Sequence, residues 1–431
     1  MLEIRYILKI YPKRNNIRLL SSVAKPNVKT DLVINNVSFK NDDFTNITPK
    51  ILSHIGKNIH TQKYHPLSMV RQRIVNYFYK RFVTNRGNPI FSMHENISPI
   101  VTTDQNFDSL LIPKDHPSRS KSDCYYLNKD YLLRAHTTAH QSELIQSGLN
   151  AFLVIGDVYR RDEIDRTHYP VFHQVDGVLL KTRDKVFPQD ESLSLFEKGN
   201  NTNGIRSQPK QACHTLEAVK VMEHDLKSTL EGLAKELFGN VKQRWVETYF
   251  PFTDPSWELE VWHKEQWMEI LGCGIMKQNI LSNSGVNDRI GWAFGLGLER
   301  IAMCLYNIPD IRLFWSEDSG FLNQFKTDDI YKQIEYKAIS QFPQCNNDIS
   351  FWLPDGYSSN DFYDLVRNIG GDMIEQVSLI DEFKHPKNEK ISHCYKITYR
   401  HMAKTLSQDE VNIIHKEIEK SASEQLNVKI R

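Results

Sequence analysis

Two arginines lie in sequence contexts that could bind an anionic group. Arg160 directly follows an apolar, strand-like run, and the planar guanidinium of an arginine can pair with a phosphate through two hydrogen bonds. Arg300 ends the segment Gly295-Leu-Gly297-Leu-Glu-Arg300, between an apolar run and a helical pattern, where it could also reach an anion. Each segment alone has a common alternative: a surface ion-pair cluster for Arg160, and close packing of a strand against a helix for the two glycines.

Three further segments carry groups that could bind a small molecule. The segment from Arg134 to Gln141 opens a helical pattern and offers histidine, hydroxyl and amide groups, which suit a carboxylate or a phosphate at a helix N-terminus. Phe250 and Phe252 are two residues apart, so on a strand they point to the same side and could line one pocket. Glu269 precedes a Gly-Cys-Gly turn and could bind a magnesium ion or an amine. Helix capping, core packing and a structural turn are the alternatives, and only the occurrence of all five segments in one chain favours a single site.

Several catalytic patterns are missing from the sequence. It has no Ser-His-Asp arrangement, no H-E-x-x-H and no P-loop, which disfavours hydrolases and P-loop enzymes. The six cysteines include no C-x-x-C pair, which argues against a zinc knuckle or redox pair and is typical of reduced thiols inside a cell. No apolar run approaches the roughly 18 residues that a membrane span needs, so we expect a soluble protein.

The hydrophobic periodicity predicts the elements that must hold these groups. Helical patterns and strand-like runs alternate irregularly, with helices at 66–84 and 216–237 and strands at 97–103, 125–127, 152–159, 177–181, 245–250, 257–263 and 267–271. Because the strands come in runs, we predict an α+β fold with a largely antiparallel sheet for residues 31–325. Residues 183–212 have little apolar pattern and contain a Gly-Asn-Asn-Thr-Asn-Gly stretch, which indicates a mobile insertion.

The last ninety or so residues form a separate pattern. Their predicted elements follow the order β-α-β-β-α-β, which is that of the ferredoxin-like split βαβ unit. We therefore expect a second domain at 341–431, after a linker at 326–340. Five of its cations are candidates for contact with nucleic acid, with ordinary solvated surface as the alternative: Lys384, Lys387, Lys390, Arg400 and Lys404.

The charge of the chain is balanced in total but not along its length. The 431 residues carry 54 Lys and Arg against 53 Asp and Glu, a net charge of +1, which excludes a globally basic protein of the histone type. Residues 1–30 hold seven Lys or Arg and one acid, a net charge of +6, which leaves about −5 for the remainder. An acid-poor, basic, Ser-containing N-terminus with an apolar helical face predicts a mitochondrial transit peptide, with a disordered basic tail that touches RNA as the alternative.

Taken together, the motifs resemble those of the monomeric mitochondrial phenylalanyl-tRNA synthetases, a family of class II aminoacyl-tRNA synthetases. The resemblance covers about residues 60–431. His65–Phe82 with Pro99 and 106–110 resembles the first class II motif, Pro113–Arg119 the family's Pro-x-x-His-Pro-x-Arg signature, Arg160–Asp162 with Phe172–Gln174 the second motif, and Gly295–Arg300 the third. This resemblance implies a class II antiparallel sheet with flanking helices and a C-terminal ferredoxin-like anticodon-binding domain.

The resemblance also implies an activity. The chain would be a ligase that activates L-phenylalanine with ATP, releases pyrophosphate and transfers phenylalanine to the 3′ end of tRNA(Phe) in the mitochondrial matrix. It would be a monomer without a separate editing subunit and without membrane contact. A class II synthetase of another specificity and a non-catalytic tRNA-binding paralogue are the alternatives.

Individual residues acquire roles by the same resemblance. The amino and carboxylate groups of phenylalanine would be held by His136, Thr138, Ala139, His140, Gln141, Gln174 and Asp176, and its ring by Phe250, Phe252, Ala293 and Phe294. ATP would be bound by Arg160, Thr167, His168, Tyr169, Phe172, Glu269 and Arg300, with Phe172 and Arg300 on the two faces of the adenine. Among these, Arg160, His168, Glu269 and Arg300 would act in catalysis, and Glu269 would be the ligand of Mg²⁺.

Two positions depart from the family pattern. Thr138 stands where family members usually have Ser, and Asp176 stands where they usually have Glu. Both keep the functional group, although the added methyl narrows the site and the shorter acid weakens the expected grip on an ammonium. An apolar pocket rejects an added hydroxyl only about 100-fold, so we expect some activation of tyrosine.

Overall fold

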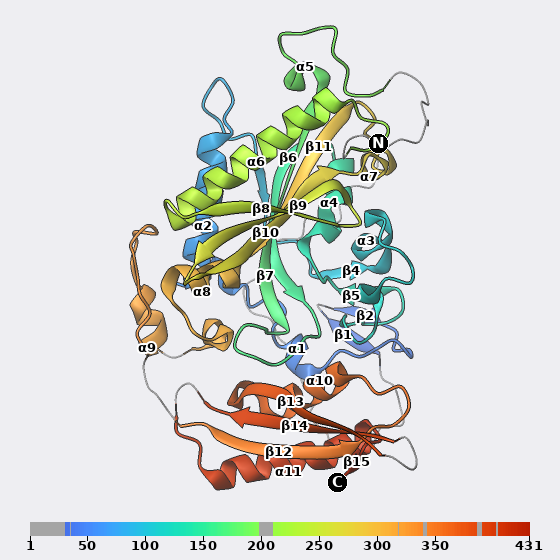
Figure 1. Cartoon of the computed structure of the whole chain (residues 1–431), viewed down its shortest axis with the longest axis vertical. Coiled ribbons are helices and arrows are strands. Elements are labelled where there is room, and N and C mark those ends of the chain that lie inside the picture. The colour runs from blue at the N-terminus through green and yellow to red at the C-terminus, as the bar shows by residue number, and fades with distance from the viewer. Residues whose placement is uncertain are drawn as a thin grey trace.

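The protein has two domains that follow each other along the chain, the larger one above and the C-terminal one below in Figure 1. The structure, a computed structural model, describes residues 31–34, 36–197, 210–317, 319–338, 343–385, 390–401 and 404–431. The predicted transit peptide and residues 198–209 of the predicted insertion lie outside the described residues. In the part that is described, none of the helices combines the length and apolar character that crossing a membrane requires.

A seven-stranded sheet forms the centre of the larger domain. Its strands lie in the order β3 (Ser92–His94), β6 (Ala151–Tyr159), β7 (Val171–Thr182), β11 (Arg289–Gly297), β10 (Gln266–Met276), β9 (Thr253–His263) and β8 (Gln243–Thr248). All neighbours are antiparallel except β3 and β6, which pair in parallel. The predicted α+β fold with a largely antiparallel sheet is therefore confirmed.

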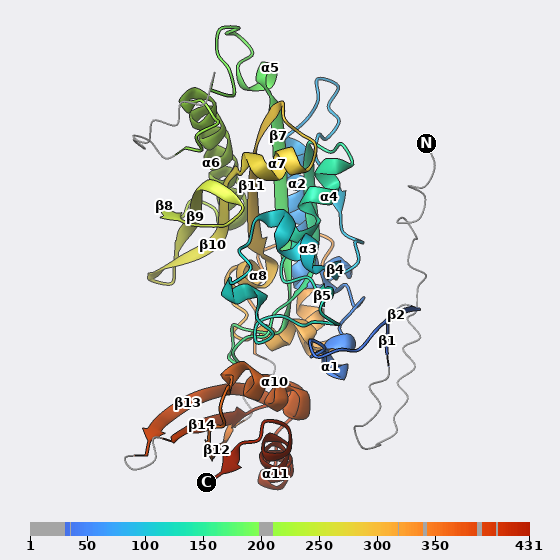
Figure 2. The ribbon, with the colours of Figure 1, turned by 90° about the vertical axis from the view of Figure 1, so that its right-hand side faces the viewer.

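Three helices pack against the sheet and against one another: α2 (Pro66–Arg81), α6 (Leu216–Phe238) and α8 (Leu298–Tyr306). In Figure 1, α6 crosses in front of the sheet, and Figure 2 shows α6 and the sheet from the side. Helix α2 begins with Pro66 in its first turn, where the missing proline N–H costs no hydrogen bond. Its apolar residues recur at helical spacing, so Val70, Ile74 and Phe78 lie on one face and are buried.

The other elements of this domain are short. They are β1 (Leu32–Ile34), β2 (Val37–Phe39), α1 (Pro49–Leu52), η1 (Ile59–Thr61), β4 (Ile100–Thr102), α3 (Thr103–Asn106), η2 (Asp108–Leu110), η3 (Pro117–Arg119), β5 (Tyr131–Leu133), η4 (Thr137–His140), α4 (Gln141–Gln146), α5 (Arg183–Val186), α7 (Gln278–Asn283), η5 (Ile311–Trp315), α9 (Ser319–Leu322) and η6 (Asn323–Phe325). The strand predicted at 125–127 is wrong: Leu127 N donates to Tyr131 O at 2.9 Å, so this segment closes a turn before β5. The predicted insertion begins with the helix α5 and is not wholly irregular.

The C-terminal domain has the predicted order of elements. They are β12 (Cys345–Trp352), α10 (Ser359–Gly370), η7 (Gly371–Met373), β13 (Ile374–Lys384), β14 (Ile391–Tyr399), α11 (Gln408–Gln425) and β15 (Lys429–Ile430). The strands lie in the order β13-β14-β12-β15, all antiparallel. Alternate residues of β14 point to the helices, so Tyr395, Ile397 and Tyr399 are fully buried. The ferredoxin-like prediction is confirmed.

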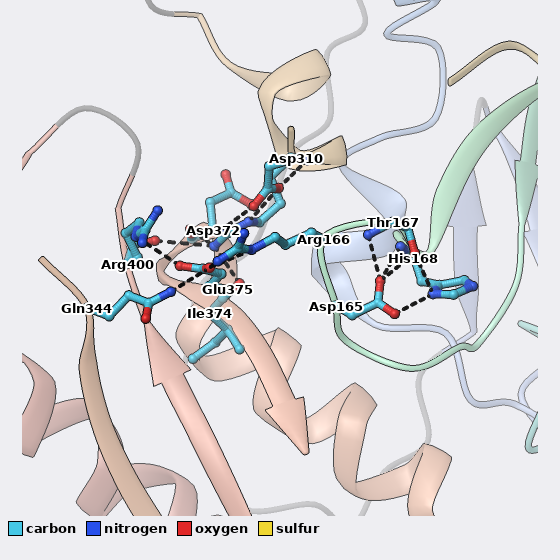
Figure 3. A network of polar contacts seen from close by, with 11 residues as sticks. Asp165, Arg166, Thr167, His168, Asp310, Gln344, Asp372, Ile374, Glu375 and Arg400 are labelled. Atoms are coloured by element: carbon cyan, nitrogen blue, oxygen red, sulfur yellow. Dashed lines mark hydrogen bonds and ion pairs between the residues drawn. The ribbon is translucent and has the colours of Figure 1, made fainter. Parts of the chain in front are cut away.

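A polar network joins the two domains, and Figure 3 shows it from close by. Glu375 of β13 is 1% exposed, and its carboxylate lies 2.6 Å from Arg166 Nη2 and 3.0 Å from Arg400 Nε. Arg312 of η5 donates to the backbone oxygens of Ile374 and Arg400 at 2.7 and 3.2 Å. Arg400, a candidate for contact with nucleic acid, therefore pairs with an acid in the domain interface. Lys404 pairs with Glu410 in the same domain, and Lys387 lies outside the described residues.

Candidate active site

A cavity of about 590 Å³ opens beside the central sheet and brings together eleven of the predicted site residues. These are His136, Thr138, Gln141, Arg160, Gln174, Asp176, Phe250, Phe252, Glu269, Ala293 and Phe294. They come from η4 and its flanks, from β7, β10 and β11, and from the loop after β8, so the fold collects residues that are far apart in the sequence.

One end of the cavity is acidic. Asp176 is 8% exposed, and the hydroxyl of Thr138 donates to its carboxylate. Burial raises the pKa of Asp176 to about 6, although the Thr138 hydrogen bond and the nearby Arg160 oppose the rise. Above that pH the carboxylate is ionised in a largely desolvated position, where it can pair strongly with an ammonium group.

A cation and a neutral histidine lie next to this acidic end. Arg160 follows the last residue of β6, and its Nε donates to Ala135 O at 2.8 Å, which directs the guanidinium toward the ring of Phe172, 5.2 Å from the ring centroid. Burial, with Arg160 nearby, lowers the pKa of His136 to about 3, so its ring is uncharged at neutral pH. Both ring nitrogens of His136 are buried, and no hydrogen bond of good geometry to either is found among the described residues.

The other end of the cavity is apolar. The rings of Phe250 and Phe252 are parallel within 5° with centroids 5.8 Å apart. Gly272 makes room for them, because a Cβ added there would lie 2.7 Å from the ring of Phe250. Ala293 also lines the cavity, and its side chain is a single methyl group. Although Phe294 borders the cavity, its ring stacks on Phe78 at 5.3 Å and so belongs mainly to the core.

Known families match nearly the whole of this architecture. Residues 50–197 and 211–325 match the class II core domain (F) of tRNA synthetases, and residues 340–431 match the ferredoxin-fold anticodon binding domain. The probable mitochondrial phenylalanine–tRNA ligase of Drosophila melanogaster is 57% identical, over 96% of both chains. The chain belongs to the phenylalanine–tRNA ligase family. The mitochondrial phenylalanine–tRNA ligases of Mus musculus and Saccharomyces cerevisiae are 54% identical (91% of this chain, 87% of the relative) and 37% identical (96% and 97%).

Glu269 and Arg300, both predicted to bind ATP, form an ion pair in the structure. Arg300 Nη1 is 3.2 Å from Glu269 Oε2, and both side chains are about half exposed. Burial and the charge of Glu269 raise the pKa of Glu258. In the β9–β10 register Glu269 lies opposite Glu260 and Glu258 lies opposite Gly272, so the carboxylates of Glu258 and Glu269 interact but are not directly opposite each other. Among the residues that the structure describes, no group of three or more His, Cys, Asp or Glu side chains could hold a metal. Two carboxylates fit Mg²⁺ that takes its other ligands from phosphates and water.

Seven predicted residues lie outside the lining of the cavity: Ala139, His140, Thr167, His168, Tyr169, Phe172 and Arg300. His140 is buried, and its Nε2 is 3.0 Å from Nη1 of Arg134 behind η4. Tyr169 is 7% exposed and stacks on Trp315 at 5.7 Å, on the side of the domain interface. His168 pairs with Asp165 at 2.8 Å, and this hydrogen bond raises the pKa of His168.

The cavity also has walls that motif reasoning did not single out. Cys124 and Asp123 line it from the loop before β5, and Asn360 lines it from α10 of the C-terminal domain. Asn360 Nδ2 donates to Ser122 O at 3.0 Å, which holds α10 against this loop. No local pattern could have indicated Asn360, because its place depends on how the two domains pack.

Proposed function

We propose that the chain activates L-phenylalanine with ATP to phenylalanyl-adenylate, releases pyrophosphate, and transfers phenylalanine to the 3′ end of tRNA(Phe). The observation that supports this most strongly is the polarity of one cavity. Its lining combines the Asp176 carboxylate and the Thr138 hydroxyl with the guanidinium of Arg160 and the stacked rings of Phe250 and Phe252. An aromatic amino acid has the same distribution of charge and apolar surface.

The first step requires no protein base. The carboxylate of phenylalanine is already ionised and attacks the α-phosphorus of ATP, and pyrophosphate leaves with the bonding electrons. Arg160, which keeps its charge even when buried, neutralises charge on the α-phosphate and orients the carboxylate. Arg300 and His168 bind the phosphate tail, and Arg300 also lies on the adenine opposite Phe172. Catalysis then comes from positioning and charge stabilisation.

Glu269 and Glu258 are the residues that would hold Mg²⁺. Bound there, the ion supplies charge neutralisation to the phosphates. If Glu269 binds the ion while Arg300 binds ATP, the 3.2 Å contact between these two side chains must loosen. The fold keeps Glu269 and Arg300 close enough to each other to bind the same nucleotide.

In the second step, a hydroxyl of the tRNA 3′ terminus attacks the carbonyl carbon of the adenylate and AMP leaves. The C-terminal domain would bind the anticodon, since it matches the anticodon-binding family. Catalytic and anticodon-binding parts lie in one chain and share a buried polar interface, which supports a monomer without a separate editing subunit. The basic residues 1–30 and the mitochondrial relatives support a location in the mitochondrial matrix.

The decisive experiment is amino-acid-dependent ATP–pyrophosphate exchange with the purified chain, run with each of the twenty amino acids. We expect strong exchange with phenylalanine and weak exchange with tyrosine, because the apolar end rejects a hydroxyl only about 100-fold. Exchange with a different amino acid would indicate another class II specificity. No exchange with any amino acid, despite binding of tRNA, would indicate a non-catalytic paralogue. Charging of tRNA(Phe) with labelled phenylalanine tests the second step.

A further inference from the structure

Two buried side chains outside the cavity connect β7 to α8. His173 of β7 has no exposed surface, and Glu299 of α8 is 3% exposed. The backbone N–H of His173 donates to Glu299 Oε2 at 2.8 Å, and His173 Nδ1 lies 2.7 Å from Glu299 Oε1. Both oxygens of one carboxylate therefore bind one residue, and this two-point contact fixes its distance and its orientation.

This pair connects the two elements at the place where their backbone pairing ends. β7 and β11 pair from Thr182↔Arg289 to Gln174↔Gly297, and α8 begins at the next residue, Leu298. His173 lies one residue beyond the last pair, and its N–H donates to the carboxylate and not to β11. Without that carboxylate, a buried N–H would lose its acceptor, which makes the contact costly to break.

Each member of the pair has one sequence neighbour that the proposed function assigns to a face of the adenine. Phe172 precedes His173, and Arg300 follows Glu299. Successive residues of a strand point to opposite faces, so Phe172 points away from the side on which His173 meets α8. The pair therefore sets the separation between the backbone that carries Phe172 and the backbone that carries Arg300.

The ring of His173 is itself held from its other sides. The ring of His60 on η1 lies 4.8 Å from it, and the ring of Trp315 on η5 lies 5.8 Å from it. Both neighbouring rings belong to elements that pack in the domain core. A rotation of His173 cannot absorb a change at Glu299, so the change would move α8.

We propose that His173 and Glu299 are positioning residues for ATP, which set the width of the adenine slot between Phe172 and Arg300. The inference rests on the proposed function, because that function supplies the nucleotide. Neither residue lines the cavity that holds the predicted phenylalanine groups. Gln174, the other neighbour of His173, is assigned to phenylalanine, but its backbone is paired with Gly156 on one side and Gly297 on the other. The pair should therefore control the affinity for ATP and leave the affinity for phenylalanine nearly unchanged.

The test compares Glu299→Ala and Glu299→Gln with the wild type in ATP–pyrophosphate exchange, with KM measured for ATP and for phenylalanine separately. Loss of one or two charge-assisted hydrogen bonds predicts a rise of about 10- to 100-fold in the KM for ATP of Glu299→Ala. Glu299→Gln keeps one acceptor oxygen, so we expect partial rescue. The KM for phenylalanine should change by less than about twofold, which is less than the change that the loss of one hydrogen bond would produce.

Glu95→Ala is the matched control. Glu95 is a largely buried acid that pairs with Arg71 of α2, away from the cavity. It should lower the melting temperature and leave both KM values unchanged. Calorimetric titration of ATP into each variant, without amino acid, measures the nucleotide affinity independently of the reaction.

Three results would overturn the inference: an unchanged KM for ATP in Glu299→Ala, an equal rise of both KM values, or unfolding of both Glu299 variants, which would show a role in the whole fold. Failure of the wild type to exchange pyrophosphate with phenylalanine would refute the proposed function instead. In that case, an ATP affinity that falls in Glu299→Ala by calorimetry would still support the positioning role.

Discussion

The segment Gly295–Arg300, which resembles the third class II motif, offers a test of the role of Asp176. In Gly295→Ala, a single added methyl group points at the Asp176 carboxylate. A Cβ added at Gly295 would lie 2.7 Å from Asp176 Oδ1 and 3.5 Å from Asp176 Cγ. Contacts between carbon and oxygen lie at roughly 3.3–3.6 Å, so in Gly295→Ala the carboxylate must retreat by about 0.6 Å or more. Gly295 lies opposite Asp176 in the β11–β7 register, so the strand itself holds the methyl in place.

The expected cost follows from the interaction that is displaced. A hydrogen bond to a charged group contributes about 1.5–3 kcal/mol, and each 1.36 kcal/mol is a factor of ten. If Asp176 binds the ammonium of phenylalanine, Gly295→Ala should raise the KM for phenylalanine by about 10- to 150-fold. The KM for ATP should change by less than about twofold, since the displaced carboxylate belongs to the amino-acid end.

The assay is ATP–pyrophosphate exchange at pH 8, where Asp176 is ionised, with thermal melting as a check on folding. Gly297→Ala is the matched control, because Gly297 is on the same strand and an added Cβ would meet no atom within 4 Å. It should leave the KM for phenylalanine unchanged. If Gly295→Ala folds and keeps the wild-type KM for phenylalanine, Asp176 does not bind the ammonium and the assignment of this end of the cavity is wrong.

Four other predictions concern residues of the same cavity. Burial raises the pKa of Asp176 to about 6, and the ionised form is the one that binds the ammonium. The KM for phenylalanine should therefore rise as the pH falls below about 6 and stay constant above about 7. In Asp176→Asn, this rise of the KM at low pH should be absent. The same variant should melt at a higher temperature at pH 8, since a raised pKa means that the charged form destabilises the fold above that pKa; an unchanged melting temperature would contradict the burial argument. Ala293→Gly should improve the use of para-chlorophenylalanine about tenfold or more relative to phenylalanine, and unchanged kinetics with para-substituted analogues would refute the role of Ala293. Glu269→Gln should raise the Mg²⁺ concentration for half-maximal exchange roughly tenfold or more, and an unaltered Mg²⁺ titration would exclude Glu269 as a ligand.

Much of the catalytic domain could be predicted from the sequence, because its signals are local. The strand-to-helix change around Gly297 follows from periodicity. Phe250 and Phe252 line one cavity as predicted, but they lie in the turn between β8 and β9 and not on a strand, so their two-residue spacing is not the reason. Contacts that depend on packing could not be predicted. Tyr125 lies in the run predicted as a strand, yet its hydroxyl donates to Asp364 at 2.8 Å, 239 residues away. The ring of Tyr125 is buried in the main apolar core of the catalytic domain, while its hydroxyl is paired with the second domain.

The presence of Asn360 in the wall of the cavity has a consequence for protein engineering. A chimera that joins this catalytic domain to a foreign ferredoxin-like domain would keep every residue of the three class II motifs. It would nevertheless lose Asn360, the bond from Tyr125 to Asp364 and the pair of Arg161 with Asp361. The two domains are therefore not interchangeable modules. A substitution on α10 should require a compensating substitution in the loop before β5.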